Sequence, residues 1–369
     1  MFEKKESKLK LAQKEAENAI IKTNEKIDEL GQATSILFSE LNSIHEAFNA
    51  IRNVPTEKRL RFEELKQIRL NWKQQAEKIE RDYKVATVKN AGVGAAGTSL
   101  GVAVVTMGPT VAMGVATTFG VASTGTAISA LSGAAATNAA LAWLGGGALA
   151  AGGGGMAAGN AFLAMAGPVG WAIAGVALLT SGFFLWKNHS DKQYLERVFT
   201  LISKRDVTSY NLATVELDER ITRIIYESGQ LHKANEEIRT YGLDYNSMSE
   251  SQQYSLGTSL NMMHSSTQLL LNPISGLLPK YTEADYNSFE ASNSFGDTII
   301  EHVECKPLII SLANFLYNID LNDKEKRLLT KSIKRNKPLL NSMGVTKKDL
   351  KIDIVGISYE ALKYKENKN

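Results

Sequence analysis

Polar and apolar positions alternate with a heptad period through the first part of the chain. The seam steps by three and four residues in turn, through Ile27, Leu30, Thr34, Leu37, Leu41, Ile44, Phe48 and Ile51. Glu, Lys and Gln fill most positions between them, as in an amphipathic helix with one apolar stripe. The period predicts a helix over 4–52, about 70 Å long. Pro55 disfavours a helical conformation at Val54, so this helix should end at the break over 53–56. Thr56 should then cap a second helix.

A second heptad pattern lies beyond the middle of the chain. Its positions are Leu217, Ile221, Ile224, Ser228, Leu231, Asn235 and Ile238. They predict a helix from Asp191 to about Arg239, with Gly242 as its stop. Shorter helices are expected near 307–319 and 323–336, the latter capped by Asn322 or Asp323. Residues 246–266 are rich in Ser, Gln and Asn and show no clear period. The basic tail, 347–369, is expected to fray, and residues 351–355 alternate like a short strand.

Polar residues interrupt the first seam. Gln13, Thr23 and Thr34 occupy seam positions, which argues against a strong isolated pair of helices. We therefore expect an all-α fold, a long amphipathic helical bundle or coiled coil with a central Gly/Ala-rich apolar helical hairpin.

One long stretch of the chain carries no charge at all. From residue 90 to residue 186, 97 positions contain no Asp, Glu, Lys, Arg or His, and they hold 21 of the 29 glycines. Since 22% of the whole chain is charged, chance does not produce a gap of this length. The gap divides the chain into charged heptad helices (1–89), an uncharged segment (90–186), a returning long helix (187–245) and a smaller helical region (246–369).

Parts of the uncharged segment are long and apolar enough to enter a bilayer, where one crossing takes about 20 residues. The best candidate is 161–186, followed by 91–113 and 139–158. Small residues spaced four apart favour close helix contacts within it. The membrane-inserting residues that we single out are Gly97, Gly101, Gly155, Gly159, Trp171, Gly175, Phe183, Phe184 and Trp186. Basic residues on both flanks predict an even number of crossings, two or four.

The sequence offers little chemistry for catalysis or ligand binding. Its 42 basic and 39 acidic residues nearly cancel, which argues against nucleic acid as a partner. Cys305 is the only cysteine, so disulfide frameworks and multi-cysteine zinc sites are excluded. Residues 92–97 match the GxGxxG dinucleotide pattern, but no strand precedes them and no carboxylate follows about 20 residues on. We expect no enzyme activity, cofactor, metal or small-molecule substrate. The scattered histidines are expected to be ordinary: His45, His189, His232 and His264.

The layout resembles that of α-helical membrane-perforating proteins. Heptad helices over 9–51 and 217–238 enclose the uncharged segment, as in cytolysin A-like toxins, colicin pore domains and apolipoprotein L. In that class amphipathic helices shield an apolar hairpin, which is released into a bilayer. Colicin hairpins lie near the C-terminus, whereas this one is central. Residues 122–158 also look like the Gly/Ala-rich segments of interferon-inducible small mitochondrial proteins and of some bacterial proteins.

Three functions remain open from the sequence. The first is a membrane-inserting pore-forming or membrane-disrupting effector. The second is a constitutive integral membrane protein with a helical cytoplasmic scaffold for partner binding or membrane shaping, and the third is a soluble structural bundle. The expected partners are a lipid bilayer and either further copies of the chain or a helical protein. Because the first residues are charged, we expect synthesis in the cytoplasm without a signal peptide, then membrane association or signal-independent export.

Overall fold

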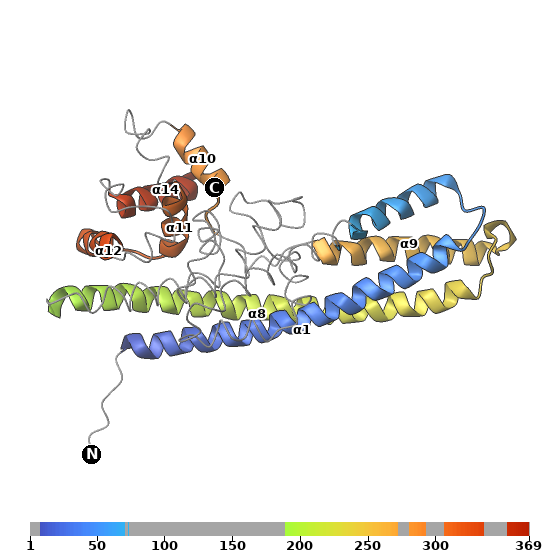
Figure 1. Ribbon diagram of the computed structural model, residues 1–369, viewed down its shortest axis with the longest axis horizontal. Coiled ribbons are helices and arrows are strands. Elements are labelled where there is room, and N and C mark those ends of the chain that lie inside the picture. Colours follow the sequence, from blue (N-terminus) through green and yellow to red (C-terminus); the bar gives the residue numbers. More distant parts are fainter. Residues whose placement is uncertain are drawn as a thin grey trace, which may run out of the picture.

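The computed structural model describes residues 8–70, 73, 189–271, 280–292, 306–335 and 353–368. These ranges are helical apart from their turns, and they contain no β-strand, so the fold is all-α as predicted (Figure 1). An unlabelled helix covers residues 56–70. The labelled helices are α1 (Lys8–Asn49), α8 (His189–Arg239), the 3-10 turn η3 (Tyr245–Ser247), α9 (Glu250–Leu271), α10 (Glu283–Ala291), α11 (Lys306–Leu316), α12 (Asp323–Arg335) and α14 (Ile354–Lys368).

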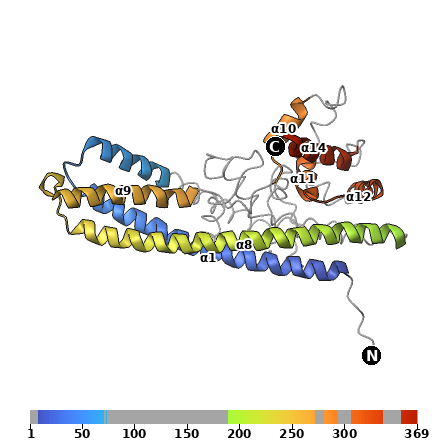
Figure 2. The same ribbon diagram turned by 180° about the vertical axis from the view of Figure 1, so that it is seen from behind.

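The two long helices, α1 and α8, lie side by side and run in the same direction (Figures 1 and 2). Thr23 Oγ1 lies 3.2 Å from Thr214 Oγ1, 191 residues further along the chain. Asn235 Nδ2 donates to Ser43 Oγ at 2.7 Å, across 192 residues. The residue numbers of the paired positions thus differ by 191 and 192 at two places along the helices. A nearly constant difference shows that the helices are parallel and paired in one register.

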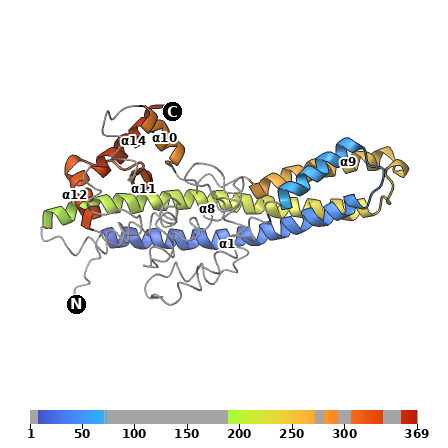
Figure 3. The ribbon, with the colours of Figure 1, turned by 45° about the horizontal axis from the view of Figure 1, so that its top comes forward.

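The turns that follow the two helices meet at the same end of the pair. Arg52 and Asp244 form a parallel backbone bridge, in which Arg52 N donates to Leu243 O at 2.8 Å and Tyr245 N to Arg52 O at 3.0 Å. Asn53 Nδ2 also donates to Asp244 Oδ1 at 3.0 Å. The turns reverse the chain, so helix 56–70 and α9 both run back over the long pair and complete a four-helix end (Figure 3).

Each turn contains one residue in the left-handed region of backbone space. Gly242 has φ = 84°, which suits glycine because it lacks a Cβ, and this confirms Gly242 as the stop of α8. In the first turn the same region is occupied by Asn53, with φ = 60°. Asn tolerates this conformation better than most other residues.

The predicted heptad seam forms the core of the four-helix end. Leu30, Leu37, Leu41 and Ile44 have no exposed surface, while Phe48 and Ile51 expose 4% and 1%. The side chain of Ile27 lies outside the described residues. On α8 the apolar positions of the second seam are buried as well, and they share one core with α9 and helix 56–70. The prediction of a long helical bundle is therefore confirmed.

Polar seam positions are buried too, and several pair across the two long helices. Thr23 Oγ1 donates to Ala19 O at 2.8 Å and also meets Thr214, so its hydroxyl is satisfied within the interface. Asn235 is buried beside Ser43. Thr34 Oγ1 is the exception among them, because it is buried without a hydrogen-bond partner. Polar side chains that pair across two helices meet in one register only, so they specify the register of α1 against α8.

A second core lies at the other end of the long pair, where α10, α11, α12 and α14 pack over the first half of α8 (Figure 3). Arg205 Nη1 donates to the carbonyl oxygens of Phe315 and Tyr317, at 2.8 and 2.7 Å, and so clamps the end of α11 to α8. Glu325, which has no exposed surface, accepts from Arg197 of α8 and from Asn322 N. Asn322 in turn caps α12 as predicted.

One expectation for the second half of the chain is wrong, and one region without a clear period proves helical. The tail does not fray over 354–368, because α14 buries Ile354 and Val355 completely against α11 and α12. These two residues also belong to the stretch that alternates like a strand. Residues 250–271 form the helix α9, despite their polar composition. In both regions, packing against neighbouring helices outweighs a weak local pattern.

The seam makes a quantitative prediction about stability. Leu37→Ala and Leu41→Ala should each lower the free energy of unfolding by roughly 2–5 kcal/mol, because each leaves a cavity in a closed core. Ile36→Ala is the matched control, since Ile36 lies on the same helix with 56% of its surface exposed. Urea denaturation followed by circular dichroism measures all three. Equal midpoints for the three variants would show that the seam is not a packed core.

Candidate functional site

The residues predicted to insert into a membrane lie outside the described residues. This holds for Gly97, Gly101, Gly155, Gly159, Trp171, Gly175, Phe183, Phe184 and Trp186. Among the helices of the described ranges, none combines the length and the apolar character that a membrane crossing requires. The site therefore has to be built from the described residues on either side, which are helix 56–70 before the uncharged segment and the start of α8 after it.

The two sides of the segment are attached to opposite ends of the long pair. Arg69, near the end of helix 56–70, touches His45 in the four-helix end. At the other end the first turns of α8 share the second core with Leu9 of α1. Leu9 and His45 lie 36 residues apart on one helix, which corresponds to about 54 Å. The last described helix before the segment and the first one after it are thus joined to the bundle at positions far apart along its axis.

Helix 56–70 binds to the bundle through a short apolar face. Phe62 stacks on His45 with ring centroids 4.1 Å apart and planes 5° apart, and its centroid lies 4.9 Å from that of Phe48. Leu65 is buried one turn later. At the start of the helix, Lys58 Nζ donates to the Tyr245 hydroxyl at 3.0 Å. The contact is therefore anchored by an aromatic stack at its centre and by a polar bond near the turn.

The same face ends in a buried cation. Arg69 exposes only 2% of its surface, and its Nη2 donates to His45 Nδ1 at 3.1 Å. Its Nε and Nη1 are buried without a hydrogen-bond partner. Burial lowers the pKa of Arg69 to about 10, so the group stays charged at neutral pH. A buried guanidinium without a carboxylate opposes the docking of its own helix, because its lost hydration is not replaced.

The bond from Arg69 determines which nitrogen of His45 carries the hydrogen. Arginine has no acceptor, so Nδ1 must offer its lone pair and the neutral ring must carry its hydrogen on Nε2. The atom 3.1 Å from Nε2 is Nδ2 of Asn49. Because both nitrogens would then be donors, this tautomer requires the Asn49 amide to be turned by 180°, so that its oxygen accepts the hydrogen of Nε2. Burial, first, and the charges of Arg69 and Lys66 lower the pKa of His45 to about 4. The histidine is thus held neutral.

Sequence reasoning missed this pair. His45 was expected to be ordinary, but it exposes only 7% of its surface and contacts both an aromatic ring and a buried cation. A usable signal was present in the second helix. Phe62, Leu65 and Arg69 are spaced by three and four residues, and the same spacing continues in the sequence at Trp72, so an arginine occupies an otherwise apolar position of this heptad stripe.

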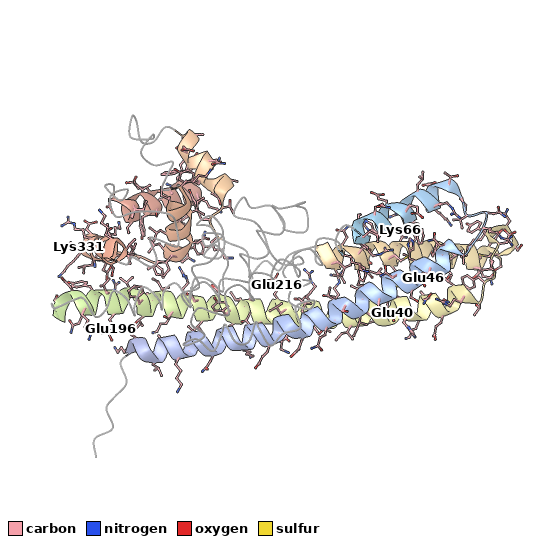
Figure 4. The ribbon with its side chains drawn as sticks, viewed as in Figure 1. Glu40, Glu46, Lys66, Glu196, Glu216 and Lys331 are labelled. Carbon is pink, nitrogen blue, oxygen red and sulfur yellow. The ribbon has the colours of Figure 1, made fainter. Side chains whose placement is uncertain are left out.

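Elsewhere the long pair presents charged and a few apolar side chains to solvent. Figure 4 shows Glu40, Glu46 and Lys66 on the helices of the four-helix end, and Glu46 is exposed. On α8, between the two cores, Leu212 and Val215 are 65% and 66% exposed and lie one turn apart. The described residues contain no group of three His, Cys, Asp or Glu that could hold a metal ion.

Comparison with protein-family models, with curated proteins and with solved structures finds no match to this chain. Its function is therefore argued from its own residues. Among the described residues, the His45–Arg69 pair places a buried cation against a neutral histidine, and Arg69 belongs to the helix that precedes the uncharged segment in the chain.

The electrostatics of Arg69 predict the effect of removing its charge. Arg69→Met keeps a long apolar stem and removes the uncompensated guanidinium, so the free energy of unfolding should rise by about 1–3 kcal/mol. Arg61→Met, at an exposed position of the same helix, should change it by less than about 0.5 kcal/mol. Chemical denaturation at neutral pH provides the measurement. A loss of stability in Arg69→Met would contradict the view that the charge is uncompensated.

Proposed function

We propose that this protein is a membrane-inserting α-helical effector, which forms pores or disrupts bilayers by releasing its uncharged segment from a helical bundle. The observation that carries the proposal is the 97-residue stretch without charge, joined to a folded bundle of charged helices. In water such a segment has to cover an apolar surface larger than a soluble monomer usually exposes. A bilayer offers the same segment an apolar environment.

The charged bundle is the part that we expect to stay outside the membrane. Glu25, Glu29 and Glu46 are exposed along α1, and each charge at a bilayer centre would cost about 2.5–3.5 kcal/mol. Apart from Leu11 and Ile36, the described apolar side chains of α1 are buried or partly buried against α8 and the other helices. Entry into lipid would therefore bury little further apolar surface of the long helices. This supports a bundle that stays outside the bilayer while the uncharged segment enters it.

The docking of helix 56–70 supports release. This helix precedes the uncharged segment in the chain, and its buried face contains the guanidinium of Arg69, whose Nε and Nη1 have no hydrogen-bond partner. Part of the stabilisation from Phe62 and Leu65 is offset by that charge, so the helix can separate at modest cost. A difference of only a few kcal/mol between held and released states can be reversed by a lipid surface or a partner.

The resemblance to membrane-perforating helical proteins fits this proposal. Their long amphipathic helices flank or cover an apolar hairpin, as α1 and α8 flank the uncharged segment along this chain. The partners that follow are a lipid bilayer and further copies of the chain, because a pore of single hairpins needs several of them. Leu212 and Val215, exposed on α8 between the two cores, offer the segment an apolar surface before release.

A constitutive integral membrane protein with a helical scaffold is the second candidate. It is favoured by the junction after the segment, where Trp186 and Lys187 form an aromatic and basic pair of the kind found at membrane interfaces. The helix α8 begins at His189, directly behind this pair. Purification separates the two candidates, because the effector should remain in solution without detergent and the integral protein should require it.

A charge placed inside the best predicted span tests insertion. Gly175→Arg should oppose entry by about 2.5–3.5 kcal/mol if residue 175 reaches the bilayer centre, and it should reduce dye leakage from liposomes accordingly. Gly229→Arg is the matched control. Gly229 is exposed on α8, and a Cβ added there meets no atom within 4 Å, so the bundle tolerates the change.

The two variants together decide the outcome. Reduced leakage for Gly175→Arg with unchanged leakage for Gly229→Arg supports insertion of 161–186. If Gly175→Arg and the unmodified protein cause equal leakage and bind liposomes equally, that span does not insert. If the unmodified protein causes no leakage under any condition, the proposed function is wrong.

A further inference from the structure

We propose that His45 is a proton switch, whose protonation at Nδ1 detaches helix 56–70 from α1 and thereby frees the uncharged segment. This inference concerns regulation and rests on the proposed function. Its basis is the contact between His45 and Arg69, in which a histidine nitrogen is the hydrogen-bond acceptor of a buried guanidinium.

Protonation changes the sign of this contact. Nδ1 can accept from Arg69 only while it holds a lone pair, and a proton on Nδ1 takes that lone pair away. The same event places a second positive charge 3.1 Å from Nη2 of Arg69. Because Nε and Nη1 of Arg69 already lack partners, the guanidinium is then left without any hydrogen bond in the interface. One proton therefore removes a bond and adds repulsion at the same position.

The charges around the ring do not, taken together, stabilise the protonated form. The ring of His45 stacks on Phe62 and meets the neutral amide of Asn49. The described charges that act on the ring lie on helix 56–70, where Arg69 and Lys66 oppose protonation and Glu63 favours it. The histidines of the neighbouring helices, His232 on α8 and His264 on α9, are exposed and do not act on the ring. The two cations that act on the ring outweigh the one carboxylate that does.

The direction of the effect follows from linkage. The folded bundle favours the neutral ring and holds the pKa of His45 near 4, against 6.5 in an unfolded chain. Docking of helix 56–70 is therefore strongest above pH 6.5, weakens as the pH falls, and reaches its minimum below pH 4. Between pH 7 and pH 4.5 the equilibrium for release should shift by roughly 60-fold.

Hydrogen exchange of the full chain, measured by mass spectrometry between pH 7 and pH 4.5, tests the switch. After correction for the intrinsic exchange rate, amides of residues 56–70 should lose protection by tens of fold, while those of α11 and α14 change little. His45→Gln should abolish this loss, because the Gln oxygen accepts from Arg69 and does not bind a proton. His232→Gln, which alters an exposed histidine of α8, should behave like the unmodified protein.

A second measurement needs no variant. Nitrogen chemical shifts of the histidine rings at neutral pH should show His45 with its hydrogen on Nε2. A hydrogen on Nδ1 would overturn the proposal, since Arg69 could not then donate to it. An acid-induced loss of protection in His45→Gln equal to that of the unmodified protein would overturn it as well.

Leakage from phosphatidylcholine vesicles, followed over the same pH range, separates this inference from the proposed function. Leakage that rises on acidification in the unmodified protein and in His232→Gln, but not in His45→Gln, supports both. Leakage without pH dependence supports the function and rejects the switch. Exchange that depends on His45 without any leakage retains the switch and rejects the function.

Discussion

The parallel pairing of α1 with α8 in one register is the constraint on which the rest of the structure depends. Because the two helices run the same way and end together, the turns after them meet, and the bridge between Arg52 and Asp244 joins them. Each turn sends the chain back over the pair, which creates the four-helix end. The opposite end of α8 then remains accessible to the C-terminal helices. One interface thus positions both cores.

Polar residues make this pairing specific. A seam of Leu and Ile alone could shift by seven residues and still bury apolar surface. The Thr23–Thr214 contact and the Asn235–Ser43 bond are satisfied only in the observed register, where the two turns also coincide. The polar interruptions of the first seam, which argue against a strong isolated helix pair, therefore act here as register markers within a bundle.

Helix positions could be predicted from the sequence because periodicity and turn residues are local. Residues 191–239 were expected as a helix and α8 covers His189–Arg239, while Asn322 caps α12 as expected. The parallel direction of the long helices was not readable, since a heptad seam pairs in either direction. The helix α14 was missed because its burial depends on α11 and α12, which are distant in sequence. Among the predicted site residues, those of the heptad seam lie in the described part of the chain and are buried as expected, apart from Ile27. The predicted membrane-inserting residues lie outside the described residues.

The described helices before and after the uncharged segment are bound to the long pair with different strength. At the end where the C-terminal helices pack, Arg205 of α8 binds the end of α11. There the buried carboxylate of Glu325 accepts hydrogen bonds from Arg197 of α8 and from Asn322 N at the start of α12. At the four-helix end, helix 56–70 buries a guanidinium that only a neutral histidine satisfies. Natural proteins tolerate such local conflicts mainly where function needs a weak point. In the chain, the strained contact of Arg69 comes before the uncharged segment and the contacts of Arg205 and Glu325 come after it. The proposed release should therefore begin at helix 56–70 while α8 remains attached.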